Sequence, residues 1–236
     1  MKRTKNWFRS DYLLITSISL LIVNLFFIFF LTNFSRIVYM IFYYHVSSAW
    51  LSYFSFAISF IFHLLYLKQK KLLWNILGKN SIVVGVFFCA FTLITGSLWY
   101  NATSGGYNNV YWQWSDARQT MTLVLFLSYL SYLIFGAMIE EREKKAKLTS
   151  ILGIIFFPMV PLSYLSAIIF TSLHPLINPN PTGSGYIYWD FMKLFVLFLN
   201  LFAITIFYIY VVGNLVELDL NKEKLNEIIQ SNLRED

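Results

Sequence analysis

Charged residues are scarce in this chain. Only 13% of its 236 residues are charged, whereas 58% are hydrophobic and 20% are aromatic. A soluble domain carries about 25% charged residues, so the deficit excludes an ordinary globular protein and indicates an all-α, polytopic membrane protein. The net charge of +6 does not indicate nucleic-acid binding, because the basic residues lie in short clusters beside apolar runs.

The sequence also has only one cysteine and none of the common nucleotide-binding motifs. The single cysteine, Cys89, lies within an apolar run, which excludes an intramolecular disulfide, a CxxC redox motif and a CxxCH haem-attachment motif. The sequence has no glycine-rich phosphate loop, so an ATP-driven mechanism would require another subunit. The apolar spans contain no acidic residue, which argues against a proton-coupled pump.

Long apolar runs, by contrast, are abundant. A helix of about 20 apolar residues crosses a bilayer, and six stretches qualify: roughly 12–32, 46–67, 81–99, 120–139, 150–171 and 191–213. We therefore predict a single integral membrane domain over residues 1–236 with six transmembrane helices. The first span is expected to be a retained anchor rather than a cleaved signal peptide, and the tail 214–236 to continue the last helix as an amphipathic segment.

The basic residues predict the orientation of these spans. Of the 18 lysines and arginines, all but Arg36, Arg118 and Lys193 lie in the N-terminal segment, the second and fourth connections and the C-terminal tail. The positive-inside rule then places both termini in the cytoplasm. The three sparsely basic connections, about 33–45, 100–119 and 172–190, are expected on the outer face of the cell membrane.

Small residues recur at helical spacing on the second and third spans. Such stripes let membrane helices approach closely, so these two faces are expected to pack within the bundle, although the outer serines could instead leave room for a flat ligand beside His45. The stripes are Ser48, Ser52, Ser55 and Ser59 on the second span and Gly85, Cys89, Thr92 and Gly96 on the third.

Two of the three histidines are predicted to lie at the outer face. His45 precedes the second span, and His174 follows the fifth and is itself followed by Pro175. An isolated histidine near a membrane helix end can simply bond backbone or face headgroups, but two that converge on one face favour a metal-centred ligand such as haem. His63 lies about 27 Å along the same helix from His45 at 1.5 Å per residue, so it cannot ligate the same iron and is interpreted as structural.

The outer connection 100–119 is unusually rich in aromatic rings. Its rings and their neighbours form either an ordinary interfacial aromatic belt or a platform on which a porphyrin stacks. On the second interpretation Arg118 pairs with a haem propionate and Asp116 orients Arg118 or a histidine ring. The aromatic residues of this connection, with Trp99 at the end of the preceding span, are Trp99, Tyr100, Tyr107, Tyr111, Trp112 and Trp114.

Four segments resemble a known family. The run Trp112-Gln113-Trp114-Ser115-Asp116-Ala117-Arg118-Gln119-Thr120 resembles the signature of the WWD-domain haem-handling proteins (CcmC, CcmF and CcsA), and most closely that of CcmC of the cytochrome c maturation system. The other three segments also resemble CcmC motifs: His45-Val46-Ser47-Ser48-Ala49-Trp50, Thr95-Gly96-Ser97-Leu98-Trp99 and Ser172-Leu173-His174-Pro175. The similarity covers about residues 36–180.

The resemblance implies a haem-handling membrane protein of c-type cytochrome biogenesis rather than an enzyme. It implies haem b as non-covalent, transient cargo, with His45 and His174 as axial iron ligands over a surface formed by Trp99, Trp112 and Trp114. The implied partners are a CcmE-like extracytoplasmic haem chaperone that receives the haem, a small CcmD-like membrane subunit, CcmA-like and CcmB-like transporter subunits, and membrane lipid.

The sequence also departs from the family pattern. Ser115 is inserted between Trp114 and Asp116, and Gln119 replaces an apolar residue. Two other functions therefore stay open. One is a cytochrome c haem lyase or synthase subunit, although the sequence has no sizeable outer domain. The other is a small-molecule membrane transporter whose outer aromatic residues only anchor the bundle.

Overall fold

The structure, a computed structural model, describes residues 11–32, 40–103, 109–170 and 191–235. Within these residues six helical segments are long and apolar enough to cross a membrane, with α5 and α6 together forming the fifth. The predicted all-α, polytopic architecture is therefore confirmed. The helices are α1 (Asp11–Phe30), α2 (Ile41–Gln69), α3 (Leu72–Thr103), α4 (Ala117–Ala137), α5 (Arg142–Phe156), α6 (Met159–Ile169) and α7 (Phe191–Glu235).

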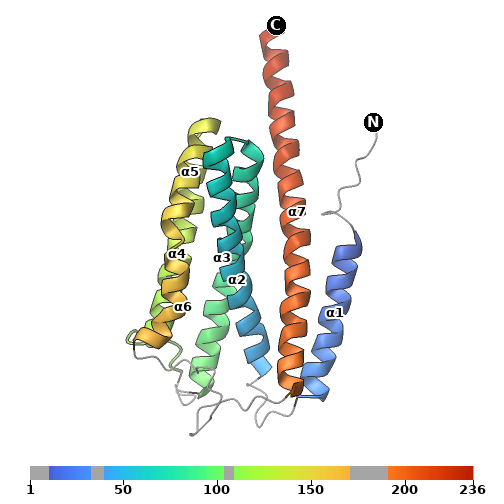
Figure 1. The fold of residues 1–236 in the computed structure, drawn as a ribbon, viewed down its shortest axis with the longest axis vertical. Coiled ribbons are helices and arrows are strands. Elements are labelled where there is room, and N and C mark those ends of the chain that lie inside the picture. Colours follow the sequence, from blue (N-terminus) through green and yellow to red (C-terminus); the bar gives the residue numbers. More distant parts are fainter. Residues whose placement is uncertain (1–10, 33–39, 104–108, 171–190, 236) are drawn as a thin grey trace.

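The helices run side by side, and successive spans alternate in direction (Figure 1). The start of α1 lies at the same end of the bundle as the short connections 70–71 and 138–141, and α7 ends beyond the bundle on that side. The ends of α1, α3 and α6 lie at the opposite end, next to the starts of α2, α4 and α7. This is the arrangement that six antiparallel spans require.

Several helices extend further than the apolar runs predicted. The helix α2 begins at Ile41, so His45 lies inside a helix and not in the preceding connection, and α3 contains Lys79 as well as residues 100–103. A 32-residue helix is about 48 Å long, whereas the hydrocarbon core is about 30 Å thick. Polar residues therefore continue the helix into the interface, where the backbone hydrogen bonds remain satisfied within the helix.

The fifth span is interrupted where a continuous helix was expected. Helix α5 ends at Phe156 and α6 begins at Met159, with Pro158 between them. Proline has no backbone N–H and its ring collides with the preceding turn. The Phe157 N–H bonds instead to the Ile154 carbonyl at 3.2 Å, a tighter turn that ends α5.

The stripes of small residues pack within the bundle, as predicted. All four serines of the α2 stripe are buried, and α2 and α3 form the most extensive helix pair among the described residues. A Cβ on Gly85 would lie only 2.6 Å from Cε1 of Phe56, so the close approach requires glycine there. Thr92 and Ser48 join the two helices through their hydroxyl oxygens at 3.0 Å.

Helix α1 packs on α7, and α7 in turn contacts α2 and α3 (Figure 1). Buried polar side chains link these helices within the apolar layer: Ser17 Oγ donates to the Ala203 carbonyl at 3.0 Å, and Asn200 Nδ2 donates to the Tyr43 carbonyl at 3.0 Å and to Ser47 Oγ at 2.8 Å. Such interhelical bonds hold membrane helices in register where lipid supplies no hydrophobic drive.

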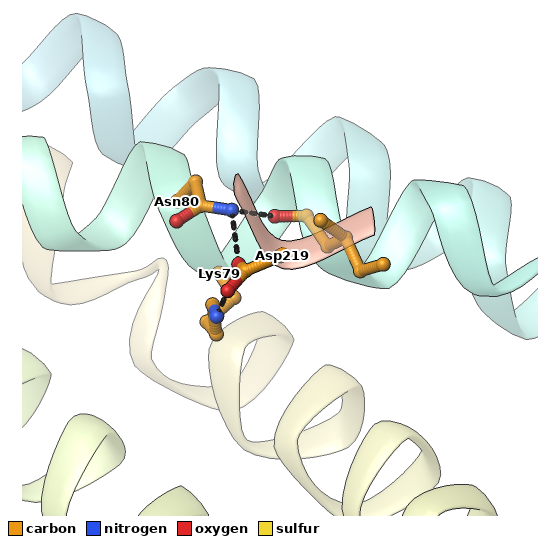
Figure 2. Close-up of polar contacts among 4 residues, drawn as sticks. Lys79, Asn80 and Asp219 are labelled. Atoms are coloured by element: carbon orange, nitrogen blue, oxygen red, sulfur yellow. Dashed lines mark hydrogen bonds and ion pairs between the residues drawn. The ribbon is translucent and has the colours of Figure 1, made fainter. Parts of the chain in front are cut away.

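Helix α7 continues through the predicted tail as far as Glu235 and projects past the other helices (Figure 1). Where it leaves the bundle, the Asp219 carboxylate accepts from Lys79 Nζ and from Asn80 Nδ2 (Figure 2). Asn80 also donates to the Ile76 carbonyl of its own helix. These contacts join α7 to α3 at the end of the bundle that the basic residues assign to the cytoplasm.

Candidate functional site

A cavity of about 100 Å³ opens between α2, α3 and the start of α4, at the end of the bundle where α2 and α4 begin and α3 ends. Its walls combine aromatic rings, small residues, one histidine, one carboxylate and one guanidinium. The lining residues are Phe42, His45, Val46, Ala49, Tyr53, Thr92, Leu93, Gly96, Ser97, Trp99, Tyr100, Thr103, Trp112, Asp116, Arg118, Gln119 and Thr122.

His45 is held against α3 at this cavity. Its Nδ1 lies 3.1 Å from Oγ1 of Thr95. A Cβ added to Gly96 would lie 3.0 Å from Cε1 of His45, so the ring rests on α3 at a position where any larger residue would press on it. The histidine therefore has a defined place on the cavity wall instead of a free position in the outer connection.

The tryptophans divide between the cavity and the surface. Trp99 belongs to the last turns of α3, and it lines the cavity together with Trp112. Trp114 is 72% exposed and does not line the cavity, but its ring centroid lies 5.7 Å from that of Trp112 in an edge-on contact. The Nε1–H of Trp112 is buried without a hydrogen-bond partner among the described residues.

Asp116 and Arg118 each have a structural partner. The Asp116 side chain caps α4 by accepting from the Gln119 N–H at 3.0 Å, and the residue is 4% exposed. Arg118 Nη1 donates to the carbonyls of Ser163 and Tyr164 at 3.3 and 2.7 Å, so the guanidinium joins α4 to α6.

Ser163 is the centre of a polar network behind the cavity. Its hydroxyl lies 3.1 Å from the Tyr53 hydroxyl and 3.3 Å from the Thr122 hydroxyl, and its carbonyl accepts from Ser166 at 2.7 Å as well as from Arg118. The network ties α2, α4 and α6 together at the cavity end.

Among the described residues, His45 is the only histidine that lines this cavity. His174 lies outside the described residues. His63 is fully buried in the opposite half of α2, where its Nδ1 and Nε2 each lie 3.1 Å from a hydroxyl, that of Ser150 and that of Tyr132 respectively. Within the described residues no three His, Cys, Asp or Glu side chains gather as a metal-ion site.

The predicted site residues thus largely come together. Five of the seven line the cavity, namely His45, Trp99, Trp112, Asp116 and Arg118. The sequence interpretation did not assign a site role to Thr95 or Tyr53, and it assigned Gly96 only to helix packing. Thr95 and Gly96 do belong to a segment that resembles the family, but nothing local in the sequence shows that they meet His45.

Comparison with known proteins gives a consistent result. A putative cytochrome c biosynthesis ccmC-like mitochondrial protein of Marchantia polymorpha is 31% identical over 72% of this chain and 71% of its own length. A Heme exporter protein C of Bradyrhizobium diazoefficiens is 31% identical over 55% of this chain, and the ccmC-like mitochondrial protein of Arabidopsis thaliana is 33% identical over 55%. The matched segments span about half of those two relatives, 48% and 46% respectively.

The names of these relatives describe haem export and cytochrome c biosynthesis, and none of them names a catalysed reaction. They agree with the prediction that the chain is not an enzyme. The family model described as CcmC, Heme exporter protein C, matches residues 3–227. The chain belongs to the CcmC (Heme exporter protein C) family.

Proposed function

We propose that this chain handles haem in c-type cytochrome biogenesis, binding it at the cavity beside α2 and α3 and passing it to an extracytoplasmic haem chaperone. His45 is the first axial ligand of the iron, and His174 is the second. The observation that carries the proposal is the placement of His45, held by Thr95 and Gly96 in a cavity that Trp99 and Trp112 also line.

The size of the cavity determines how the porphyrin is seated. Typical small-molecule pockets measure about 300–1,000 Å³, so a cavity of about 100 Å³ holds only part of a haem. The rest of the macrocycle extends outward over the tryptophan-rich segment, where Trp114 is exposed next to Trp112. A partly exposed haem suits a protein that passes its cargo to an acceptor.

Polar groups at the cavity supply places for the propionates. The buried Nε1–H of Trp112 is an unused donor among the described residues, and such donors are costly to leave unpaired. Arg118 uses Nη1 for the α6 carbonyls, so its remaining N–H groups are the ones that pair with a propionate. Asp116 acts on this region by capping α4 and thereby placing Arg118.

The proposed cargo is haem b, held without a covalent bond. Cys89 is fully buried within the bundle between α3 and α4, where its Sγ lies 4.0 Å from the Thr122 carbonyl. Thioether attachment would require an accessible thiol. Ligation by two imidazoles gives a six-coordinate iron whose release requires the exchange of one axial bond.

The positive-inside rule places the cavity on the outer face of the cell membrane. An outer site fits a CcmE-like chaperone as the acceptor, with a CcmD-like subunit and CcmA-like and CcmB-like transporter subunits as associates. Aromatic and apolar residues on the sides of the helices that point away from the bundle contact membrane lipid.

The proposal is tested by the visible absorption spectrum of the purified protein after expression with ample haem. We expect a low-spin, bis-histidine spectrum in the parent, and its loss or conversion to high spin in both His45→Ala and His174→Ala. A His63→Ala variant, taken from the monodisperse fraction, serves as the control and keeps the low-spin spectrum. If the parent binds no haem, or if neither outer substitution changes its haem spectrum, the proposal is overturned and the transporter interpretation is favoured.

A further inference from the structure

We infer that Thr95 is a positioning residue for the iron ligand: its hydroxyl accepts a hydrogen bond from Nδ1–H of His45 and so holds the imidazole as the tautomer whose Nε2 binds iron. This inference rests on the proposed function. It concerns the contact between α2 and α3, on which the position of the ligand depends.

The hydrogen-bond inventory of Thr95 determines the direction of this bond. A hydroxyl has one hydrogen to donate and two lone pairs that accept. Thr95 Oγ1 lies 2.8 Å from the Phe91 carbonyl one turn earlier in α3, an acceptor that can only receive this hydrogen. The same oxygen lies 3.1 Å from His45 Nδ1. When the hydroxyl gives its hydrogen to the Phe91 carbonyl, Thr95 accepts from His45 and Nδ1 carries the proton.

Burial makes this bond persistent. Thr95 is only 4% exposed, so water has little access to its hydroxyl. One turn deeper, the Thr92 and Ser48 hydroxyls join the same two helices at 3.0 Å. Gly96 lets the His45 ring lie flush against α3, since a Cβ there would stand 3.0 Å from Cε1. The imidazole is thus held in its orientation before any ligand arrives.

The protonated Nδ1 has a chemical consequence at the other nitrogen. A neutral imidazole with its hydrogen on Nδ1 presents the lone pair of Nε2 to a metal, and a bond from the N–H to an acceptor raises the basicity of the ligand. The acceptor here is a hydroxyl, which is weaker than a carboxylate. Thr95 therefore fixes the tautomer and orientation of His45 while strengthening the iron bond only moderately, as suits a ligand that must later release its cargo.

The tautomer can be measured without haem. In protein labelled with ¹⁵N-histidine, with the His45 signals identified by their loss in His45→Ala, nitrogen chemical shifts should show a protonated Nδ1 for His45. Thr95→Val removes the hydroxyl at nearly constant shape and should move the population toward the Nε2–H form, whereas Thr95→Ser should keep the parent pattern. An Nε2–H tautomer in the parent would overturn the inference.

Haem binding gives the second readout. Thr95→Val should weaken haem binding about 10-fold or more, the usual effect of losing a partner of a metal-bound histidine, and should shift the midpoint potential to more positive values because the imidazole donates less charge. Thr95→Ser should restore both. Thr205→Val is the matched control, because Thr205 on α7 makes the same bond to its own helix, at 2.7 Å to the Leu201 carbonyl, but lies away from the cavity.

The outcomes separate the two proposals. Haem binding that depends on His45 but is the same in Thr95→Val and the parent would overturn this inference alone. Haem binding that does not depend on His45 would overturn the proposed function and this inference together. An equal loss in Thr95→Val and Thr205→Val would show a general effect on helix stability and would also contradict the positioning role.

Discussion

At the scale of residues, the two histidines of α2 show how neighbouring helices decide the role of one residue type. His45 meets Thr95 of α3 at the wall of a cavity. His63 is enclosed, because both of its nitrogens meet hydroxyls and its ring lies against two glycines, Gly78 of α3 and Gly153 of α5. A ring enclosed in this way joins helices and has no room for a ligand.

This enclosure predicts the effect of enlarging Gly153. A Cβ there would lie 2.5 Å from Cδ2 of His63, so Gly153→Ala should destabilise the fold by about 1–3 kcal/mol, the usual cost of overpacking. The measurement is the thermal unfolding midpoint in detergent followed by circular dichroism. Gly136→Ala is the matched control, and it should cost less because its Cβ would lie 3.2 Å from Cγ2 of Thr149.

A double-mutant cycle identifies the His63 ring as the cause. In a His63→Ala background the clashing ring is gone, so adding Gly153→Ala should lower the unfolding midpoint by much less than it does in the parent. The same loss in both backgrounds would contradict the proposed contact.

At the scale of elements, α7 is the longest helix described, and charged side chains hold the part that leaves the bundle. Arg142, at the start of α5, lies 2.9 Å from a Glu223 carboxylate oxygen and 3.2 Å from one of Glu227. Together with the Asp219 contacts of Figure 2, these pairs fasten the extension of α7 to α3 and α5. All three groups of the Arg142 cluster are partly or largely exposed, so each pair contributes at most about 1 kcal/mol.

We therefore expect Arg142→Glu to loosen this extension. Limited proteolysis with an endoproteinase specific for lysine should cleave at Lys222 and Lys224 faster, by up to about five-fold if opening of the helix controls cleavage. Adding Glu223→Arg reverses the pair and should return the rate toward that of the parent. A cleavage rate that is the same in the parent and in both variants would show that these ion pairs do not hold the extension.

At the scale of the whole molecule, the orientation in the membrane decides which partners reach the cavity. The described helices place the cavity at one end of the bundle and the connection 70–71 at the other. The sequence predicts that the first of these ends lies outside, because it carries few lysines and arginines.

Labelling from one side of the membrane tests this assignment. In a Cys89→Ala background, a cysteine at Ser115 should react with a membrane-impermeant maleimide in intact spheroplasts, whereas one at Lys71 should react only after the membrane is opened. Both positions are exposed, so access through the protein does not limit the reaction. The reverse pattern would place the cavity on the cytoplasmic side and exclude an extracytoplasmic acceptor.

The candidate site was predictable in its composition but not in its contacts. The histidine and the tryptophan-rich segment are local patterns, and they led to five residues that do line one cavity. The partners of Arg118 lie 45 and 46 residues away in α6, and Thr95 lies 50 residues from His45. No periodicity within a single segment reports such pairs.

The sequence by itself determined that this is a membrane protein with six spans, because the length of an apolar run and the position of basic residues act locally on each helix. It also determined the family, through motifs that are contiguous in the chain. Only the tertiary structure decided where α2 begins beyond the apolar layer and which hydroxyl faces His45. These features depend on the packing of side chains from distant segments, and that packing exists only once the helices have come together.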